Sequence, residues 1–302
     1  MTVAPGTAAA GRVRPRLREW VVAAGPPLVL VIVLQGLYAV AAARHVHQLT
    51  GWRVLLTLLV LVPDCVGRRY VNDYEDYVRG LDRPDRVRPE SALAQGLDMR
   101  RLRTVGLACF ALAWVGLAVL AAATNLWLLP LIALCYLGYF GYAGGSRPLG
   151  HRALGELLDF VVTGTAVTLI LAWLNAGRVS GTLVLAALGP GFLFAALMLH
   201  NNARDVEKDR AVGKTTLPQV VPAAVTKTLY GCCLAGFYLV DGALAWRFHS
   251  APVLLPLLTL PWAGFLVLSV GRSRIGPSMI SWAWLYHLMI ADFVLFSMGA
   301  WF

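Results

Sequence analysis

The sequence has little charge for its length. Only 14% of its 302 residues are Asp, Glu, Lys or Arg, whereas about a quarter of the residues of a soluble domain are charged. Hydrophobic residues make up 58% of the chain, and the mean hydropathy is +0.67. This composition excludes an ordinary soluble domain and favours a chain that lies mostly within a lipid bilayer.

The sequence also lacks a cysteine pattern that would indicate a metal site or a disulfide framework. Its cysteines all lie in apolar segments, where we expect them to be packing residues: Cys65, Cys109, Cys135, Cys232 and Cys233. The first apolar run is too long for a signal peptide and is not followed by a cleavage site. No large loop interrupts the chain, so we expect no second domain.

Long apolar runs separated by short polar segments are the main feature that is present. Runs of about 20 apolar residues predict membrane-spanning helices. We place them at 20–43, 51–71, 102–123, 125–143, 153–175, 182–200, 226–246, 252–270 and 282–301. The sequence therefore predicts an all-α membrane protein, with about nine transmembrane helices around a central cavity. Residues 20–302 would form one membrane domain, and residues 1–19 a disordered basic tail.

The basic residues are distributed unevenly over this topology. All but four of the 26 lysines and arginines fall on the same side as the N-terminus; the exceptions are Arg44, Arg53, Arg178 and Arg247. The positive-inside rule then places the N-terminus in the cytoplasm. A basic surface facing anionic lipid explains the net charge of +10 without a nucleic-acid partner.

The most polar stretch, "VNDYEDYVRGLDRPDR", spans residues 71–86 and directly follows the second apolar run. Asn72 and Asp76 are four residues apart, and Asp73 and Asp76 are three apart. If the helix continues beyond the membrane, these three side chains share one face. We call these three residues the first ridge.

A second stretch, "HNNARDVEKDRAVGKTTL" at residues 200–217, follows the sixth apolar run. Asn201, Asp205 and Asp209 recur at intervals of four residues, and Asn202 lies three residues before Asp205. We call Asn201, Asp205 and Asp209 the second ridge. Both ridges would lie at the same membrane depth, which suggests two pseudo-related halves that face one cavity.

Clustered carboxylates repel each other, and burial raises that cost. Mg²⁺ relieves the repulsion because it prefers oxygen ligands and is commonly shared between carboxylates and substrate phosphates. Two ridges could therefore hold a diphosphate through Mg²⁺, with Lys214, Arg210 and Arg147 neutralising the remaining charge. The simpler alternative for either ridge is a solvated loop face that forms salt bridges.

A prenyl diphosphate fits such a site, because its head is soluble and its tail is hydrocarbon. Ionisation of an allylic diphosphate leaves a carbocation, which aromatic faces can stabilise. The candidates could equally belong to the aromatic belt at the membrane interface: Tyr70, Tyr74, Tyr139, Phe140 and Tyr142.

At these residues the sequence resembles the UbiA superfamily of intramembrane prenyltransferases, and within it the branch that prenylates 1,4-dihydroxy-2-naphthoate. The first motif of that branch matches Asn72, Asp73, Tyr74, Asp76, Gly80, Asp82, Asp85 and Arg86. The second motif matches Asp205, Asp209, Gly213, Lys214, Thr216 and Leu217. A third segment, "GSRPLGHRALGE", matches at Arg147, Gly155 and Glu156.

The resemblance implies a nine-helix fold in a bacterial cell membrane and Mg²⁺-dependent transfer of a prenyl group to an aromatic, naphthoate- or phenol-like acceptor. It implies Asp73, Asp76, Asp205 and Asp209 as metal ligands and catalytic residues. It implies a further set as substrate-binding residues: Asn72, Tyr74, Asp82, Arg86, Arg147, Asn201, Asn202 and Lys214. Glu156 and Asp159 are candidates for the base that accepts a proton from the acceptor.

Two segments depart from the family pattern. Gly25 and Pro27 stand where the first helix usually carries basic residues, and residues 88–91 read Arg-Pro-Glu-Ser in place of a Gly-Pro-x-Arg-like segment. Both elements lie near the second substrate in the family. A different aromatic acceptor is therefore one expectation. The alternative is a membrane terpene cyclase, which ionises the same diphosphate and needs no acceptor.

A transporter or structural membrane protein is the third class. Asp64, Asp241 and Asp292 lie within or near predicted spans, where ionisable residues usually mark function. We expect them instead to be helix-end groups that reach water or a hydrogen-bonded partner. A transporter would not require two diphosphate-type ridges, so we favour an enzyme.

Overall fold

The computed structural model describes residues 16–80, 89–143, 148–270 and 279–302, and these are almost entirely helical. They contain no strand beyond a single bridge between Arg152 and Thr215. The longer helices are α2 (Pro26–Arg44), α3 (Gly51–Val78), α4 (Met99–Ala122), α5 (Leu128–Ala143), α7 (Val167–Ala176), α8 (Gly181–Arg204), α11 (Ala223–Phe248), α12 (Leu260–Ser269) and α13 (Met279–Trp301). Short elements are α1 (Leu17–Ala24), η1 (Leu149–His151), α6 (Gly155–Leu158), η2 (Asp159–Ala166), α9 (Val206–Arg210), α10 (Leu217–Val220) and η3 (Ala251–Thr259).

Seven segments of the described residues are long and apolar enough to cross a membrane: α2, α4, the run Gly155–Ala176, α8, α11, the run Ala251–Ser269, and Ala283–Trp301 of α13. The all-helical membrane architecture is thereby confirmed. Two of the nine predicted spans fall outside this set. The apolar part of α5, Leu128–Tyr142, is shorter, and α3 carries Arg53, Asp64 and Arg68 along its membrane-length portion.

The first predicted span, at 20–43, is wrong as a single helix. Gly25 adopts a left-handed conformation with φ of 69° and separates α1 from α2. Pro26 and Pro27 then occupy the first turn of α2, where their missing N–H groups leave no helical hydrogen bond unmade. α1 begins at Leu17, within the segment predicted as a tail, whereas residues 1–15 lie outside the described residues.

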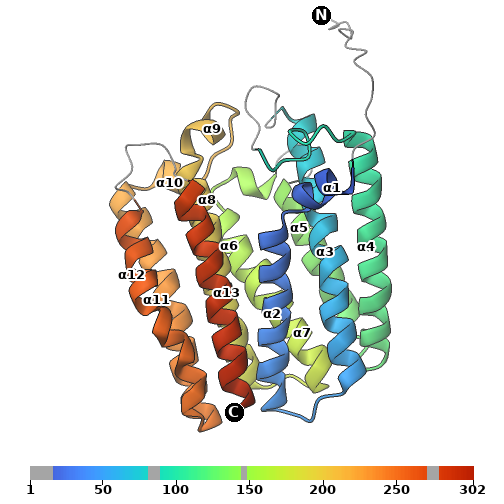
Figure 1. The fold of residues 1–302 in the computed structure, drawn as a ribbon, viewed down its shortest axis with the longest axis vertical. Coiled ribbons are helices and arrows are strands. Elements are labelled where there is room, and N and C mark those ends of the chain that lie inside the picture. Colours follow the sequence, from blue (N-terminus) through green and yellow to red (C-terminus); the bar gives the residue numbers. More distant parts are fainter. Residues whose placement is uncertain (1–15, 81–88, 144–147, 271–278) are drawn as a thin grey trace, which may run out of the picture.

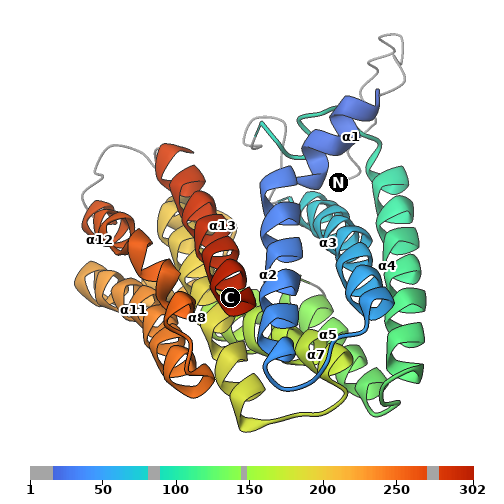
Figure 2. The same ribbon diagram turned by 60° about the horizontal axis from the view of Figure 1, so that its bottom comes forward.

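The helices form a bundle in which α2 is central. In the tilted view of Figure 2, α2 lies between α13 and α3, and it packs against both of them and against α7. Figure 1 shows α1 and α9 at one end of the bundle and the C-terminus at the other. The ends of α3 and α8 that carry the two ridges therefore lie at the end opposite the C-terminus.

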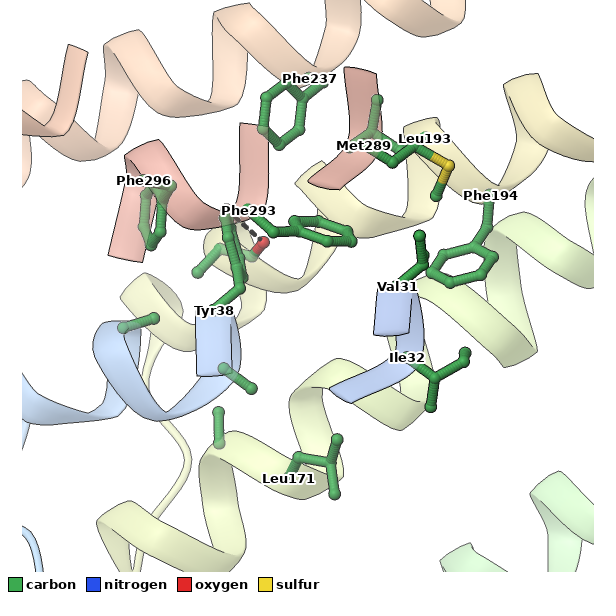
Figure 3. Close-up of a cluster of buried hydrophobic side chains, with 14 of the residues drawn as sticks. Val31, Ile32, Tyr38, Leu171, Leu193, Phe194, Phe237, Met289, Phe293 and Phe296 are labelled. Carbon is green, nitrogen blue, oxygen red and sulfur yellow. Dashed lines mark hydrogen bonds between the residues drawn. The ribbon is translucent and has the colours of Figure 1, made fainter. Parts of the chain in front are cut away.

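The main core lies where α2, α8, α11 and α13 meet (Figure 3). The ring of Tyr38 stacks on Phe296 with 3.9 Å between centroids. Its buried hydroxyl donates a hydrogen bond to the carbonyl of Ala186, so this polar group does not remain unsatisfied in the core. Phe237 and Phe293 contact the same ring from other helices. These contacts join α2 to α11 and to α13.

The predicted span 153–175 is continuous but includes a π-helical segment, η2. Gly164 of η2 lies so close to Gly191 of α8 that a Cβ at Gly164 would approach the Gly191 backbone to 2.3 Å. Gln35 of α2 donates hydrogen bonds to the Thr163 carbonyl at 2.7 Å and to the Thr168 hydroxyl at 2.9 Å. Contacts from two other helices thus hold the widened turn, which begins at Asp159.

The intramembrane carboxylates differ in their surroundings. Asp64 forms a 2.7 Å ion pair with Arg68 and accepts a hydrogen bond from Tyr136. Asp292 accepts one from Thr259. Asp241 is fully buried, and neither of its oxygens has a hydrogen-bond partner among the described residues. The expected hydrogen-bonded partner is therefore present for Asp64 and Asp292.

Candidate functional site

The first ridge lies on the end of α3, which continues as one helix to Val78. Asn72 and Asp76 line a cavity of about 280 Å³. The Asn72 amide donates a 3.0 Å hydrogen bond to Asp76 Oδ2. After α3, Gly80 adopts φ of 71° and its N–H bonds to the Tyr77 carbonyl. A glycine is favoured here because other residues disfavour the left-handed conformation.

Asp73 faces a different direction from Asn72 and Asp76, contrary to the expectation of one shared face. Its side chain is 1% exposed and does not line the cavity. Asp73 Oδ2 accepts a 2.9 Å hydrogen bond from the Ala92 N–H, and Oδ1 lies 3.4 Å from Arg69 Nε. The contact with Ala92 attaches the segment after the first motif to α3. Tyr74 also lies outside the cavity lining, with its ring 5.2 Å from the Arg103 guanidinium.

The second ridge spans a helix break. α8 ends at Arg204, Asp205 lies between the helices, and α9 begins at Val206. The Asp209 N–H still bonds to the Asp205 carbonyl at 2.8 Å. Asn201, Asp205 and Asp209 all line the same cavity as Asn72 and Asp76, in spite of the helix break.

Both carboxylates of the second ridge contact cations. The Arg204 guanidinium donates to Asp205 Oδ1 at 3.0 Å and to Oδ2 at 2.7 Å. Lys214 Nζ lies 3.1 Å from Asp209 Oδ2. Burial raises the pKa of the Asp209 carboxyl, and the Lys214 ammonium partly offsets that rise. A nearby divalent cation would stabilise the charged form further.

The loop after α9 places Lys214. Gly213 has φ of 73° and lies directly before it. The Lys214 N–H bonds to the Asp209 carbonyl at 3.0 Å, and the Ala153 N–H bonds to the Thr215 carbonyl at 3.0 Å. The segment from the third motif and the segment from the second motif are thereby joined beside the cavity. His151 of η1 lines the cavity here; burial, Lys214 and Arg79 lower its pKa.

Other predicted site residues have varied positions. Asn202 lines the cavity and donates a 2.8 Å hydrogen bond to Glu156 Oε1. Glu156 itself is absent from the lining, whereas Asp159 belongs to it. Arg210 is exposed, pairs with Glu207 at 3.4 Å and does not face the cavity. The predicted residues Asp82, Arg86 and Arg147, like Asp85, lie outside the described residues.

Two of the five candidate aromatic residues line the cavity, Tyr139 and Tyr142. The Tyr139 hydroxyl donates to the Arg68 carbonyl at 2.5 Å, and the Arg68 guanidinium lies 5.8 Å from the centre of the Tyr139 ring. Tyr70 instead donates to the Trp20 carbonyl, and Phe140 packs against Phe110.

The cavity also contains cations that the sequence reasoning missed: Arg68, Arg69, Arg204 and Lys208. Arg69 and Arg68 lie three and four residues before Asn72, so helical spacing could have placed both beside the first ridge. The rest of the lining includes apolar side chains such as Leu28, Ile32, Val162, Phe194 and Leu197. The cavity therefore combines an anion-binding set with a hydrocarbon surface.

The oxygen ligands fit Mg²⁺ that is shared with a substrate. Asn201 Oδ1 is buried, on a side chain that lines the cavity, and accepts no hydrogen bond within the described structure. No group of three His, Cys, Asp or Glu side chains in the described ranges is arranged to hold a metal alone. Mg²⁺ commonly takes one or two carboxylates together with waters and substrate phosphates. The arrangement agrees with that mode of binding.

Comparison with known proteins gives a consistent picture. The sequence model of the UbiA prenyltransferase family matches residues 29–296. The 1,4-dihydroxy-2-naphthoate octaprenyltransferase of Mycobacterium tuberculosis is 31% identical, over 86% of this chain and 85% of that protein. The enzyme with the same name from Escherichia coli is 29% identical, over 73% of this chain and 74% of that protein.

A solved structure supports the fold. The structure of a UbiA homolog from Archaeoglobus fulgidus bound to DMAPP and Mg²⁺ superposes with a TM-score of 0.62 and 17% sequence identity. The match covers 92% of this chain and 99% of that one.

Proposed function

Since the chain belongs to the UbiA prenyltransferase family, we propose that it transfers a prenyl group from a prenyl diphosphate to an aromatic acceptor with the help of Mg²⁺. One observation carries the proposal. Oxygen ligands from α3 and from the α8–α9 segment line one cavity together with several cations and apolar side chains. The Archaeoglobus structure was solved with such a diphosphate and Mg²⁺, which supports the same use here.

Asp76, Asp205 and Asp209 are the carboxylates that would hold Mg²⁺, with Asn72 and Asn201 supplying amide oxygens. Bound Mg²⁺ would neutralise charge that develops on the departing diphosphate. We assign Asp73 a positioning role instead of a ligand role. Its carboxylate accepts a hydrogen bond from Ala92 and is absent from the cavity lining.

The cations of the cavity would bind the phosphate oxygens. Arg69, Arg204, Lys208 and Lys214 all belong to the lining. Guanidinium groups can donate two parallel hydrogen bonds to a phosphate, whereas an ammonium acts as a point charge. We also propose Asp82, Arg86 and Arg147 as substrate-binding residues, because they match the motifs of the family.

The reaction would break the C–O bond between the allylic carbon and the diphosphate. The faces of Tyr139 and Tyr142 would stabilise the resulting carbocation, because aromatic rings attract cations. A carbon of the acceptor ring then attacks the allylic carbon, and the ring becomes aromatic again by losing a proton or a carboxylate. The apolar side chains beside these rings would exclude water from the carbocation.

Asp159 is the better placed of the two candidate bases. It belongs to the cavity lining, and the Thr163 hydroxyl donates a 2.8 Å hydrogen bond to its Oδ1. Glu156 is bound by Asn202 and lies outside the lining. We propose that Asp159 accepts the proton of the acceptor hydroxyl or ring carbon.

The uneven charge distribution supports a membrane orientation as well. We propose nine spans, with α3 and α5 crossing the bilayer beside the seven more apolar segments, in a bacterial cell membrane. The N-terminus and both ridges would face the cytoplasm, because nearly all lysines and arginines lie on that side. Labelling of single introduced cysteines from either side of intact cells or vesicles tests this orientation.

The reaction can be tested with purified protein, Mg²⁺ and prenyl diphosphates of several lengths, with and without 1,4-dihydroxy-2-naphthoate. A prenylated aromatic product, identified by mass spectrometry, is expected only when Mg²⁺ and an acceptor are both present. A cyclic hydrocarbon or alcohol formed without acceptor would show that the protein is a cyclase and not a transferase. Failure to release diphosphate with any prenyl donor or acceptor would contradict both activities.

A further inference from the structure

The carboxylates of the second ridge are already engaged by cations that line the same cavity. Arg204 contacts both oxygens of Asp205, at 3.0 and 2.7 Å, and Lys214 contacts one oxygen of Asp209 at 3.1 Å. The side chain of Arg204 is 13% exposed, so its charge is largely removed from water. These cations therefore occupy positions on the carboxylates that a divalent cation would otherwise take.

A metal ion and Arg204 cannot both approach the Asp205 oxygens without repulsion between their charges, which is strong at a few ångströms in a partly buried site. Displacing Arg204 from Asp205 without a new anion would leave the largely buried guanidinium unpaired, which is costly. A diphosphate provides the missing partner for Arg204. The guanidinium donates the same pair of hydrogen bonds to a phosphate as to a carboxylate.

We propose that Arg204 holds the place of the divalent cation on Asp205 until a metal and a diphosphate enter together. Asp205 then exchanges the guanidinium for the metal, and Arg204 exchanges the carboxylate for a phosphate. Lys214 makes the same exchange at Asp209, with a smaller effect because its ammonium makes a single contact. This inference rests on the proposed metal-dependent diphosphate site.

The exchange makes metal and diphosphate binding cooperative. Metal alone must displace Arg204 and leave it without an anion, so it binds weakly. Metal with diphosphate keeps every charge paired, so each ligand strengthens the binding of the other. Arg204 is thus a positioning residue for Asp205 before substrate arrives and a phosphate ligand afterwards.

The test measures metal binding directly, without turnover. Mn²⁺ is titrated into the full-length protein in detergent, and free Mn²⁺ is followed by electron paramagnetic resonance, with and without inorganic pyrophosphate. The variant is Arg204→Gln. The matched control is Arg210→Gln, which removes a charge six residues away on an exposed side chain outside the cavity lining.

Arg204→Gln is expected to bind Mn²⁺ alone about tenfold more tightly than the wild type and to lose most of the enhancement by pyrophosphate, a coupling of the usual size between linked ligands. Arg210→Gln should match the wild type in both measurements. Arg204→Lys retains the charge and should therefore keep weak binding of Mn²⁺ alone. Its retained enhancement by pyrophosphate would show that substitution at this position leaves the site folded.

Weaker binding of Mn²⁺ alone in Arg204→Gln, with Arg204→Lys normal, would overturn the exchange, because Arg204 would then only orient Asp205. Unchanged binding in Arg204→Gln would overturn it as well. Both results leave the proposed function intact. If the wild type binds no Mn²⁺ even with pyrophosphate, the metal-dependent site itself fails, and the exchange fails with it.

Discussion

The two ridges differ in how their carboxylates are held. In the first ridge, one continuous helix carries both acids. Asp76, which lines the cavity, accepts a hydrogen bond from the neutral amide of Asn72, and Asp73, outside the lining, contacts Arg69 and the backbone of Ala92. In the second ridge the helix breaks at Asp205, and Arg204 and Lys214 contact the acids. The carboxylates of the first ridge are therefore held by one unbroken helix, whereas those of the second ridge are not.

In the second ridge, the contacts of the carboxylates would have to change when a metal binds. A neutral amide need not leave when a metal binds Asp76, because the Asn72 carbonyl oxygen can serve as a ligand too. A guanidinium and an ammonium must leave their carboxylates, because like charges repel. The two sequence motifs are similar, but only the cavity-lining carboxylates of the second ridge would exchange the contacts with Arg204 and Lys214 for a metal.

Removing one acid from each ridge should stop the reaction. Asp76→Ala and Asp205→Ala are each expected to lower kcat/KM by about 10² to 10³-fold, as for the loss of one charge-stabilising group in an active site. The measurement is the rate of prenylated product at saturating Mg²⁺. A near-wild-type rate in one variant would show that its ridge does not take part, provided that thermal unfolding is unchanged.

Asp159 belongs to neither ridge and should affect only the later step. Asp159→Asn is expected to slow formation of the prenylated product by about 10²-fold, the usual contribution of a general base. Diphosphate release should fall less, because ionisation depends on the ridges. Glu156→Gln is the matched comparison and should retain faster transfer than Asp159→Asn. Equal losses in the two variants would remove the distinction between them.

Within the first ridge, Asp73 and Asp76 should separate in a metal-binding measurement. Asp76→Asn is expected to weaken binding of Mn²⁺ with pyrophosphate by about tenfold, because it removes a charge beside the metal. Asp73→Asn keeps an oxygen for the Ala92 N–H and should bind Mn²⁺ like the wild type.

Asp73→Ala tests the structural side of the same contact. Loss of the acceptor should leave the buried Ala92 N–H unsatisfied and lower the free energy of unfolding by about 1 to 3 kcal/mol. Thermal unfolding in detergent measures the change. If Asp73→Asn weakens Mn²⁺ binding as much as Asp76→Asn does, Asp73 is a ligand after all.

Each ridge is followed by a glycine with positive φ, and these should give the smallest effects. Gly80→Ala and Gly213→Ala are expected to destabilise the protein by about 1 to 2 kcal/mol each, the usual cost of a left-handed conformation for other residues. Gly213→Ala should also raise KM for the prenyl diphosphate, since Lys214 follows it directly, whereas Gly80→Ala should not. Identical KM values would show that the loop after α9 tolerates the change.

Local periodicity predicted much of the architecture and of the second ridge. Most of the apolar runs correspond to observed helices, although the run 20–43 is broken at Gly25. Asn72 and Asp76, four residues apart, line one cavity. Asn201, Asp205 and Asp209 line the cavity in spite of the break at Asp205. In each case the information lies within a few residues along one helix, where side-chain spacing determines the face.

Long-range contacts determine what the sequence could not predict. Asp73 directly follows Asn72 on a regular helix, where adjacent residues do not share a face, and its backbone partner, Ala92, lies 19 residues along the chain. The widened turn at η2 depends on Gln35 of α2 and on the close approach of Gly164 to Gly191. Gly25 followed by two prolines is a helix boundary that composition could have indicated, but the apolar run across it concealed the break.

The central claim is that both ridges hold one metal–diphosphate complex. The most direct measurement is a crystal structure with Mn²⁺ and a non-hydrolysable prenyl thiodiphosphate, in which anomalous scattering locates the metal. We expect Mn²⁺ in the cavity, in contact with Asp76 on one side and with Asp205 or Asp209 on the other, and Arg204 turned to the phosphates. Mn²⁺ bound away from either ridge, or a diphosphate outside this cavity, would contradict it.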